Sequence, residues 1–236
     1  MATDRPLPTS DFLGNMDPSD RKDLLACAQV AQYERGQHVF QCGAPGRNVY
    51  VLESGRAKIY KLADSGKEVI LWFCFPGEIF GLAEAPRGTM RQVYAQACAR
   101  VRVHVISRDD FSAYLASHPK TAMQVIDLLS CRMRVLGDML LNLVSDDVGS
   151  RIIKLLIRLA AHYGRRTEES IDLELPLTHQ EMADMVGTTR QTVTTVLGEL
   201  RRRGLLSMEH HHMQIRCEHL INSLGTATSD VELRPR

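Results

Sequence analysis

The sequence predicts an α+β protein with an N-terminal antiparallel β-roll, a long helix and a C-terminal winged helix-turn-helix domain. Three observations predict this class. Short runs of alternating apolar and polar residues, separated by glycines, fill positions 30–106; a heptad repeat follows position 118; and a helix–glycine–helix pattern lies between positions 178 and 200. With 236 residues, 44% hydrophobic and 24% charged, the chain is long enough for two cores.

The β-roll is predicted from the runs HVFQCG, NVYVLESG, RAKIYKLADSG, KEVILWFCFPG and VYAQACARVRVHVI. Glycines recur at intervals of about ten residues, as turns with positive φ between short strands require. The segment DSGKE, from Asp64 to Glu68, fits a hairpin turn. The glycines expected in turns are Gly36, Gly43, Gly46, Gly55, Gly66 and Gly77.

A long helix is predicted after His118 and Pro119, because apolar residues follow there in alternating steps of four and three. This spacing is typical of a coiled-coil seam, and its length of about three heptads favours a symmetric homodimer. The alternative is a single helix that buries the stripe on its own domain. The stripe begins at Ala122, and the interface is expected at Ile126, Leu129, Met133, Leu136, Leu140 and Leu143.

These patterns divide the chain into four parts. We expect an N-terminal region and β-roll over 1–117, a dimerisation helix over 118–146, a winged helix-turn-helix domain over 147–223 and a flexible tail over 224–236. Within the third part, VGSRIIKLLIRLAAHYG reads as a helix and IDLELP as a short strand.

The segment LTHQEMADMVGTTRQTVTTVLGELRRRGLL has the spacing of a helix-turn-helix. Thr178 followed by Glu181 forms a capping box, Ala183 is small where the helices touch, Gly187 makes the turn, and Thr189 caps the second helix. On that helix Val193, Val196, Leu197 and Leu200 are expected to point inward, and Arg190, Gln191, Thr194, Thr195 and Gly198 outward.

The outward face suits the major groove of double-stranded DNA. An arginine can bind guanine bidentately, a glutamine can address adenine, and threonines offer hydroxyl or methyl contacts, so Arg190 and Gln191 are the expected specificity residues. Thr178, His179 and Arg201 are expected at phosphates. The alternatives are an ordinary helical hairpin with a solvated face, and helix-dipole capping as the role of the arginines at 201–203. A turn at Gly204 and a two-stranded wing should follow.

Other features exclude several classes of protein. The opening MATDRPLPTSDFLGN lacks the basic start and apolar run of a secretory signal, and Arg132, Arg134 and Asp138 interrupt the most apolar region, so we expect a cytoplasmic protein without a membrane span. The six cysteines (Cys27, Cys42, Cys74, Cys98, Cys131 and Cys217) show no short ligand spacing. The net charge of +1 gives no global hint of a polyanionic partner.

Some residues would also fit a metalloprotein or an enzyme module. Histidines at 210, 211, 212 and 219 raise a metalloenzyme or metal sensor as an alternative, but consecutive histidines on a strand point to opposite faces. A regulatory cyclic-nucleotide module of an enzyme is a further alternative, and the sequence shows no nucleophile, paired carboxylates or phosphate-binding glycine loop to accompany it. The sequence therefore predicts no enzymatic activity and no metal site.

The glycine-punctuated roll, the long helix, the DV..RI step (Asp147, Val148, Arg151 and Ile152) and LTHQEMADMVGTTRQTV together resemble the CRP/FNR family of transcription regulators, over roughly Leu24 to Cys217. The resemblance implies a dimer on a palindromic site, an effector in the roll, and contacts with RNA polymerase through the turn at 64–67 and the loop at 165–169. It places Arg190 and Gln191 at the family's base-reading positions and Thr195 where the family often has arginine. The sequence RQT at Arg190 to Thr192 is most similar to that of the carbon-monoxide-sensing members.

The effector site departs from the cAMP-binding members. Gly81 is retained, but Leu82 replaces their glutamate; Arg91 matches their phosphate arginine, but Gln92 replaces serine; and their adenine-reading positions fall on Leu136 and Gly137. We therefore expect an effector other than cAMP, in a cavity bounded by the turn at Pro76 and Gly77, Arg91 and the long helix. Arg91 could clamp the carboxylate or phosphate of an apolar anion. The alternative for Arg91 is a surface residue at a strand edge.

Other family cofactors have little support in the residues. An iron–sulfur cluster would need several N-terminal cysteines, where only Cys27 stands, and the segment 81–85 lacks the haem ligands of the carbon-monoxide sensors. A haem bound elsewhere, by His38, His104 or Cys98, stays open, as does any other gas, redox or metal sensor of this architecture. The effector, the target genes and the sign of regulation are left open.

Overall fold

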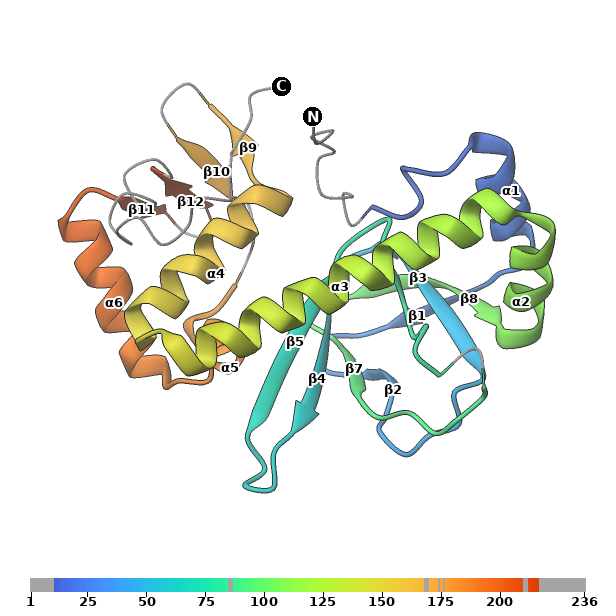
Figure 1. Ribbon diagram of the computed structural model, residues 1–236, viewed down its shortest axis with the longest axis horizontal. Coiled ribbons are helices and arrows are strands. Elements are labelled where there is room, and N and C mark those ends of the chain that lie inside the picture. Colours follow the sequence, from blue (N-terminus) through green and yellow to red (C-terminus); the bar gives the residue numbers. More distant parts are fainter. Residues whose placement is uncertain are drawn as a thin grey trace. The chain divides into compact units, whose positions relative to one another are not determined.

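The structure is a computed structural model that describes residues 11–84, 87–167, 170–173, 175, 177–209 and 212–216. Some sequence predictions fall outside these residues, namely His210, His211, Cys217, His219, the tail at 224–236, and parts of the segments 81–85 and 165–169. The chain divides into two compact units between Gly137 and Asp138 (Figure 1). No helix in the described part of the chain is long and apolar enough to cross a membrane.

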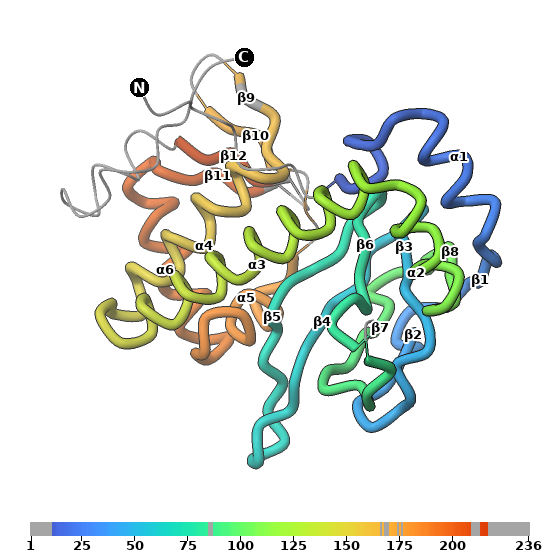
Figure 2. Tube along the Cα trace, turned by 45° about the vertical axis from the view of Figure 1, so that its right-hand side comes forward, coloured from blue at the N-terminus to red at the C-terminus, as the bar shows by residue number. Residues whose placement is uncertain are grey.

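The first unit contains the predicted antiparallel roll. One four-stranded sheet has the order β1-β8-β3-β6 and the other the order β2-β7-β4-β5, with every neighbouring pair antiparallel (Figure 2). The strands are β1 (Gln29–Tyr33), β2 (His38–Phe40), β3 (Asn48–Ser54), β4 (Ala57–Leu62), β5 (Glu68–Cys74), β6 (Ile79–Phe80), β7 (Tyr94–Ala97) and β8 (Val101–Ser107).

The glycine turns agree with the sequence pattern at five of the six positions. Gly36, Gly43, Gly55, Gly66 and Gly77 have positive φ, and Gly66 lies in the predicted hairpin between β4 and β5. Gly46 does not have positive φ, so that expectation was wrong. A side chain is excluded there for a different reason, because a Cβ would lie 2.5 Å from the Glu84 Cβ.

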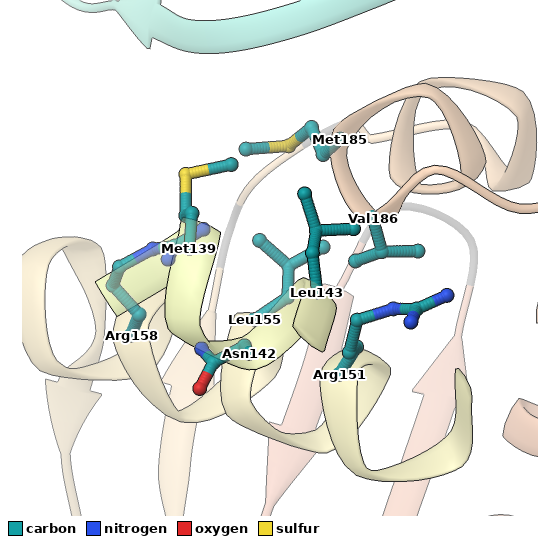
Figure 3. Close-up of a pocket in the computed structure, with 8 residues that line it drawn as sticks. All are labelled: Met139, Asn142, Leu143, Arg151, Leu155, Arg158, Met185 and Val186. Carbon is teal, nitrogen blue, oxygen red and sulfur yellow. The ribbon is translucent and has the colours of Figure 1, made fainter. Parts of the chain in front are cut away.

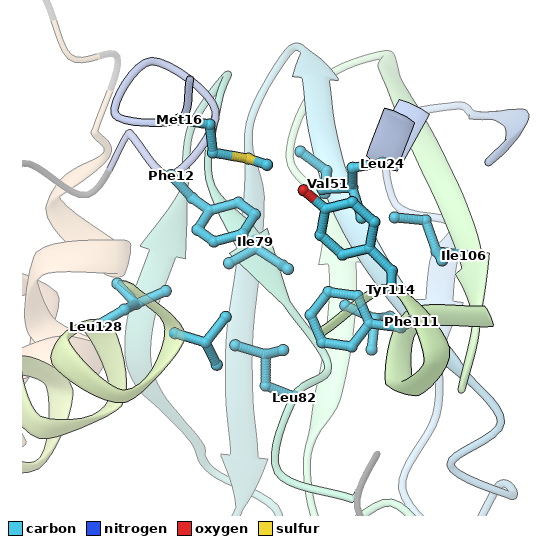
Figure 4. Close-up of a cluster of buried hydrophobic side chains, with 12 residues drawn as sticks. Phe12, Met16, Leu24, Val51, Ile79, Leu82, Ile106, Phe111, Tyr114 and Leu128 are labelled. Atoms are coloured by element: carbon cyan, nitrogen blue, oxygen red, sulfur yellow. The ribbon is translucent and has the colours of Figure 1, made fainter. Parts of the chain in front are cut away.

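The roll has two apolar cores. Between the sheets lie Phe40, Tyr50, Leu52, Ile59 and Phe80, among others. The second core packs α1 (Pro18–Ala26), α2 (Arg108–Ser117) and the first half of α3 (Pro119–Ser145) against β3, β6 and β8 (Figure 4). It contains Phe12, Met16, Leu24, Val49, Val51, Ile79, Leu82, Ile106, Phe111, Tyr114, Val125 and Leu128.

Helix α3 carries two apolar stripes. The inward stripe, which is buried, consists of Thr121, Val125, Leu128 and Cys131. The stripe expected at the dimer interface is exposed in the single chain: Ile126 53%, Leu129 42%, Met133 71%, Leu136 38%, Leu140 65% and Leu143 52%. The alternative in which this stripe is buried on its own domain was therefore wrong. The sequence reading also omitted three further exposed apolar residues of α3, Met123, Leu141 and Val144.

The second unit is the winged helix-turn-helix. Its sheet has the order β11-β12-β10-β9, and the hairpin of β11 and β12 is the predicted wing. Its elements are α4 (Val148–Tyr163), β9 (Arg165–Arg166), β10 (Ile171–Leu173), α5 (His179–Val186), α6 (Arg190–Arg202), β11 (Leu206–Glu209) and β12 (His212–Ile215). Ile152, Leu155 and Leu156 of α4 and Leu173 of β10 are at most 1% exposed.

The second unit begins at Asp138 and so includes the end of α3, whereas the sequence pattern placed the start of this domain near residue 147. The Lys154 ammonium lies 3.1 Å from the Asn142 side-chain oxygen and 2.8 Å from the Asp146 carboxylate. Asp147 caps α4, because its carboxylate accepts from the Ser150 amide at 2.7 Å. These contacts tie the last turns of α3 to α4.

Candidate nucleic-acid interface and sensor roll

The first helix of the helix-turn-helix begins at the predicted capping box. The Thr178 hydroxyl accepts from the Glu181 amide at 3.1 Å, and the Glu181 carboxylate accepts from the Thr178 amide at 2.8 Å. Both bonds satisfy amides at the helix start that have no partner within the helix. Since α5 is only eight residues long, the box fixes where it begins.

The turn between the helices depends on Gly187. Its φ is +73° and its amide donates to the Ala183 carbonyl, which closes the end of α5 in the left-handed conformation. Ala183 is fully buried, as expected for a small residue where the helices touch. A Cβ on Gly187 would meet only the Leu143 side chain, at 3.7 Å, so the backbone conformation and not the available space calls for glycine.

The second helix presents a polar face beside a buried apolar one. Thr189 caps α6 by accepting from the Thr192 amide at 3.2 Å. Val193, Leu197 and Leu200 are 0–2% exposed, whereas Val196, also expected inside, is half-buried. The outward residues Arg190, Gln191, Thr194 and Thr195 are exposed, and Gly198 is half-buried. The residues chosen for base contacts therefore lie on one exposed face at the start of α6.

A chain of hydrogen bonds links the start of α5 to this face. His179 Nδ1 lies 2.8 Å from the Thr194 hydroxyl, which donates to the Arg190 carbonyl at 2.9 Å. Because a threonine hydroxyl has one hydrogen, His179 Nδ1 is then the donor, and Nε2 of the neutral ring has no proton. Partial burial and the Arg190 charge lower the pKa of His179 from its usual 6.5, which favours this neutral ring.

The basic end of α6 shows how the three arginines differ. Arg201 and Arg202 lie in its last turn, and Arg203 is the C-cap residue. Arg202 pairs with Glu199 one turn earlier. Arg201 and Arg203 are exposed and do not share the Glu199 pair, so both are better placed than Arg202 to reach a phosphate.

In the roll, Arg91 lies in an interior environment. It is 1% exposed, and one guanidinium nitrogen donates to the Glu84 carboxylate at 2.8 Å and to the Gly81 carbonyl at 2.9 Å. The other terminal nitrogen donates to the Asn48 carbonyl. The guanidinium carbon stands 4.2 Å from the ring centroid of Phe40. The alternative of a surface arginine was therefore wrong.

The other residues expected at the effector lie in different environments, and of these only the Gly81 carbonyl and the Gln92 backbone share the surroundings of Arg91. Gln92 is exposed, and Leu82 is 6% exposed within the core between roll and helices. Gly81 adjoins Arg91 and has a φ of +76°. Leu136 and Gly137 lie on the exposed side of α3. The effector role of these residues stays a prediction.

The side chains considered as haem ligands already have partners. His38 Nε2 lies 2.9 Å from the Tyr60 hydroxyl, and His104 Nε2 lies 3.2 Å from the Glu53 carboxylate. Cys98 is half-buried on the turn before β8. Within the described ranges, no three histidine, cysteine or acidic side chains are grouped so as to hold a metal ion.

Two features were missed by the sequence reading. The first is Glu84, the partner of Arg91, whose role needs the folded loop to be seen. The second is a groove in the second unit between the end of α3, α4 and α5, where Arg151 and Arg158 lie beside apolar side chains (Figure 3). It is lined by Met139, Asn142, Leu143, Arg151, Leu155, Arg158, Met185 and Val186.

Comparison with known proteins agrees with this division. The model of the cyclic nucleotide-binding domain matches residues 30–118, and that of the Crp-like helix-turn-helix domain matches residues 150–220. A CRP-like cAMP-activated global transcriptional regulator of Mycobacterium tuberculosis is 29% identical over 87% of this chain and 92% of its own length. A global nitrogen regulator of Synechococcus elongatus is 29% identical over 79% and 85%.

Solved structures show the same fold. A CooA mutant from Carboxydothermus hydrogenoformans superposes with a TM-score of 0.75 and 24% identity, covering 94% of this chain and 96% of that one. FixK2 from Bradyrhizobium japonicum gives a TM-score of 0.73 at 22% identity, covering 83% and 96%. With a cyclic nucleotide-binding domain followed by a Crp-like helix-turn-helix domain, the chain is a non-enzymatic, DNA-binding transcription regulator and belongs to the CRP/FNR family.

Proposed function

We propose that this regulator works as a homodimer that inserts α6 of each subunit into the major groove of a palindromic operator. The observation that carries the proposal is the start of α6, where Arg190 and Gln191 are exposed directly after the Thr189 cap while the opposite face is buried. A short helix fixed at its start by a cap holds its first side chains in a defined direction, as base recognition requires.

The chemistry of this face suggests the half-site. Arg190 suits guanine through its two parallel donors, and Gln191 suits adenine. The Thr195 hydroxyl donates to the Gln191 carbonyl at 3.1 Å, so its hydrogen is used within the helix. Thr195 is then left with lone pairs and a methyl group, which suit a base-pair edge that offers a donor or the thymine methyl.

Phosphate contacts would orient the helix. Thr178 and His179 lie at the start of α5, where helix amides and the macrodipole favour an anion, and Arg201 lies at the far end of α6. The three positions could anchor the backbone of the duplex on both sides of the recognition face.

The exposed stripe of α3 supports the homodimer. Its six residues are 38–71% exposed and follow a heptad spacing that a second copy of the same helix would bury. A two-fold dimer would also present two recognition helices to the two halves of a palindrome.

We further propose that an effector acts through the roll and that it is not cAMP, since Leu82 and Gln92 stand where polar partners of cAMP are expected. The M. tuberculosis relative is named as cAMP-activated, so we expect the two proteins to differ in effector. The turn at 64–67 and the loop at 165–169 are proposed contacts with RNA polymerase. Because its targets are genes, we expect the protein in the cytoplasm.

Selection from a random DNA duplex library tests the DNA-binding proposal. The wild type should enrich a two-fold symmetric site. Arg190→Ala should lose base preference at one symmetric pair of positions, whereas Arg201→Ala should weaken all sites about equally and reduce the salt dependence of binding. Enrichment of the same site by wild type and Arg190→Ala would contradict the assignment of Arg190, and no enriched site for the wild type would contradict the operator.

A further inference from the structure

Glu84 and Arg91 form a buried ion pair in the roll. Both side chains are almost completely buried, with exposed fractions of 5% for Glu84 and 1% for Arg91. One Glu84 oxygen accepts from the Arg91 guanidinium at 2.8 Å, and the other accepts from the Gln92 amide at 3.3 Å. A guanidinium and a neighbouring backbone amide that converge on one carboxylate are the donors that bind anions in proteins. Here the anion belongs to the chain itself.

The surroundings of the guanidinium leave little capacity for a second anion. Its two terminal nitrogens already donate to the Glu84 carboxylate and to the carbonyls of Gly81 and Asn48, whereas Nε is buried without a hydrogen-bond partner. The Phe40 ring covers it at 4.2 Å. Gly81 is so close that a Cβ there would lie 3.1 Å from an Arg91 nitrogen. An external phosphate would therefore have to displace a carboxylate that is held at high effective concentration.

We infer that Glu84 is the specificity-determining residue of the sensor roll: its carboxylate occupies the anion position at Arg91 and excludes effectors that would place a phosphate or carboxylate there. This inference rests on the proposed function insofar as the roll is taken as the sensor. It revises the sequence expectation that Arg91 clamps an external anion, and it leaves effectors that bind away from Arg91 as the class that the roll would accept.

Chemical rescue provides the test. Glu84→Ala leaves a buried guanidinium without its counterion and opens room for a small anion. The melting temperature of this variant should be below that of the wild type and should rise, saturably, with sodium acetate or inorganic phosphate but not with sodium chloride of equal ionic strength. Glu53→Ala is the matched control, because Glu53 pairs with Arg102 at 2.9 Å where both side chains are exposed. Its melting temperature should not respond specifically to acetate or phosphate.

Titration of the wild type supplies an arm that does not require a Glu84 variant to fold. Isothermal titration with inorganic phosphate and with cAMP should show no saturable binding at Arg91. Saturable binding that Arg91→Met abolishes would overturn the inference, as would a folded Glu84→Ala variant without anion-specific rescue. If Glu84→Ala does not fold, Glu84→Ser replaces it, because the short serine side chain also leaves room for a small anion, and anion-specific stabilisation is again required.

Operator binding by the same samples separates this inference from the proposed function. A wild type that ignores cAMP and phosphate yet protects a selected palindrome satisfies both. A wild type that enriches no DNA site would contradict the operator proposal, while the rescue experiment would still decide the role of Glu84.

Discussion

The stripe of exposed apolar residues on α3 gives a prediction that a matched pair of variants can test. Leu140 lies on the expected dimer seam, and its neighbour Leu141 points about 100° away on the same helix. The two leucines are 65% and 63% exposed. Substitution of each by glutamate therefore makes the same chemical change at the same exposure, and only Leu140→Glu should disrupt the dimer.

The magnitude follows from the exposed fraction. Full burial of a leucine contributes about 1.5–3 kcal/mol, so covering the exposed two thirds of Leu140 would contribute about 1–2 kcal/mol per subunit and about 2–4 kcal/mol per dimer. At about 1.4 kcal/mol per factor of ten, the dimer dissociation constant of Leu140→Glu should rise by at least about 30- to 700-fold. Burial of two like charges at the seam would increase this further.

Sedimentation equilibrium over a range of protein concentrations measures both dissociation constants. A dissociation constant for Leu140→Glu within threefold of the wild type would refute the seam. Equal weakening by Leu140→Glu and Leu141→Glu would mean that the contact is a broad apolar face and that the heptad register is wrong. Thermal unfolding of both variants at low concentration controls for loss of the fold.

Three further predictions concern the DNA-binding unit. Gly187→Ala places a side chain at a φ of +73° with no close contact, so it should cost about 1–2 kcal/mol of unfolding free energy, measured by urea denaturation; a loss below about 0.3 kcal/mol would contradict the strain argument. Thr178→Ala removes one half of the capping box and should cost about 1 kcal/mol, with Thr178→Ser restoring most of it in the same assay. The pKa of His179 lies below 6.5 in the free protein, and a bound phosphate would raise it, so operator affinity should increase as the pH falls, by up to about tenfold per pH unit for each of the two histidines of the dimer. Fluorescence anisotropy with labelled operator, measured from about pH 7.5 downward to about pH 5.5, should show this increase in affinity for the wild type and not for His179→Asn. Affinities of the two proteins that change in parallel with pH would exclude proton uptake by His179 on DNA binding.

The helix-turn-helix could be predicted closely because its determinants are local in sequence. Thr178 and Glu181, which form the capping box, are three residues apart. Gly187 is a glycine that can adopt the left-handed conformation and so marks the end of α5. The buried and exposed positions of α6 follow one helical period, and only Val196 was placed too deep. Each of these features is decided within one or two helical turns.

The environment of Arg91 could not be predicted in this way. Its contacts come from Asn48 on β3, Gly81 after β6 and Glu84 in the next loop, so they depend on how distant segments meet. A pattern of residue types shows a basic side chain before a strand and leaves open whether it faces solvent. Gly46 is similar, because its close neighbour is the Glu84 side chain, which the local sequence does not reveal.

The two stripes of α3 also constrain how this helix can change in length during evolution. Val125 and Leu128 attach it to the roll, whereas Met133 and Leu140 lie further along on the exposed seam. Insertion of one residue between these pairs would turn the seam by about 100° relative to the roll, while insertion of seven would turn it by only about 20°. Insertions and deletions within α3 should therefore persist only where they add or remove close to a whole number of helical turns, such as about 7, 11 or 18 residues, so that the roll and the expected seam stay in phase.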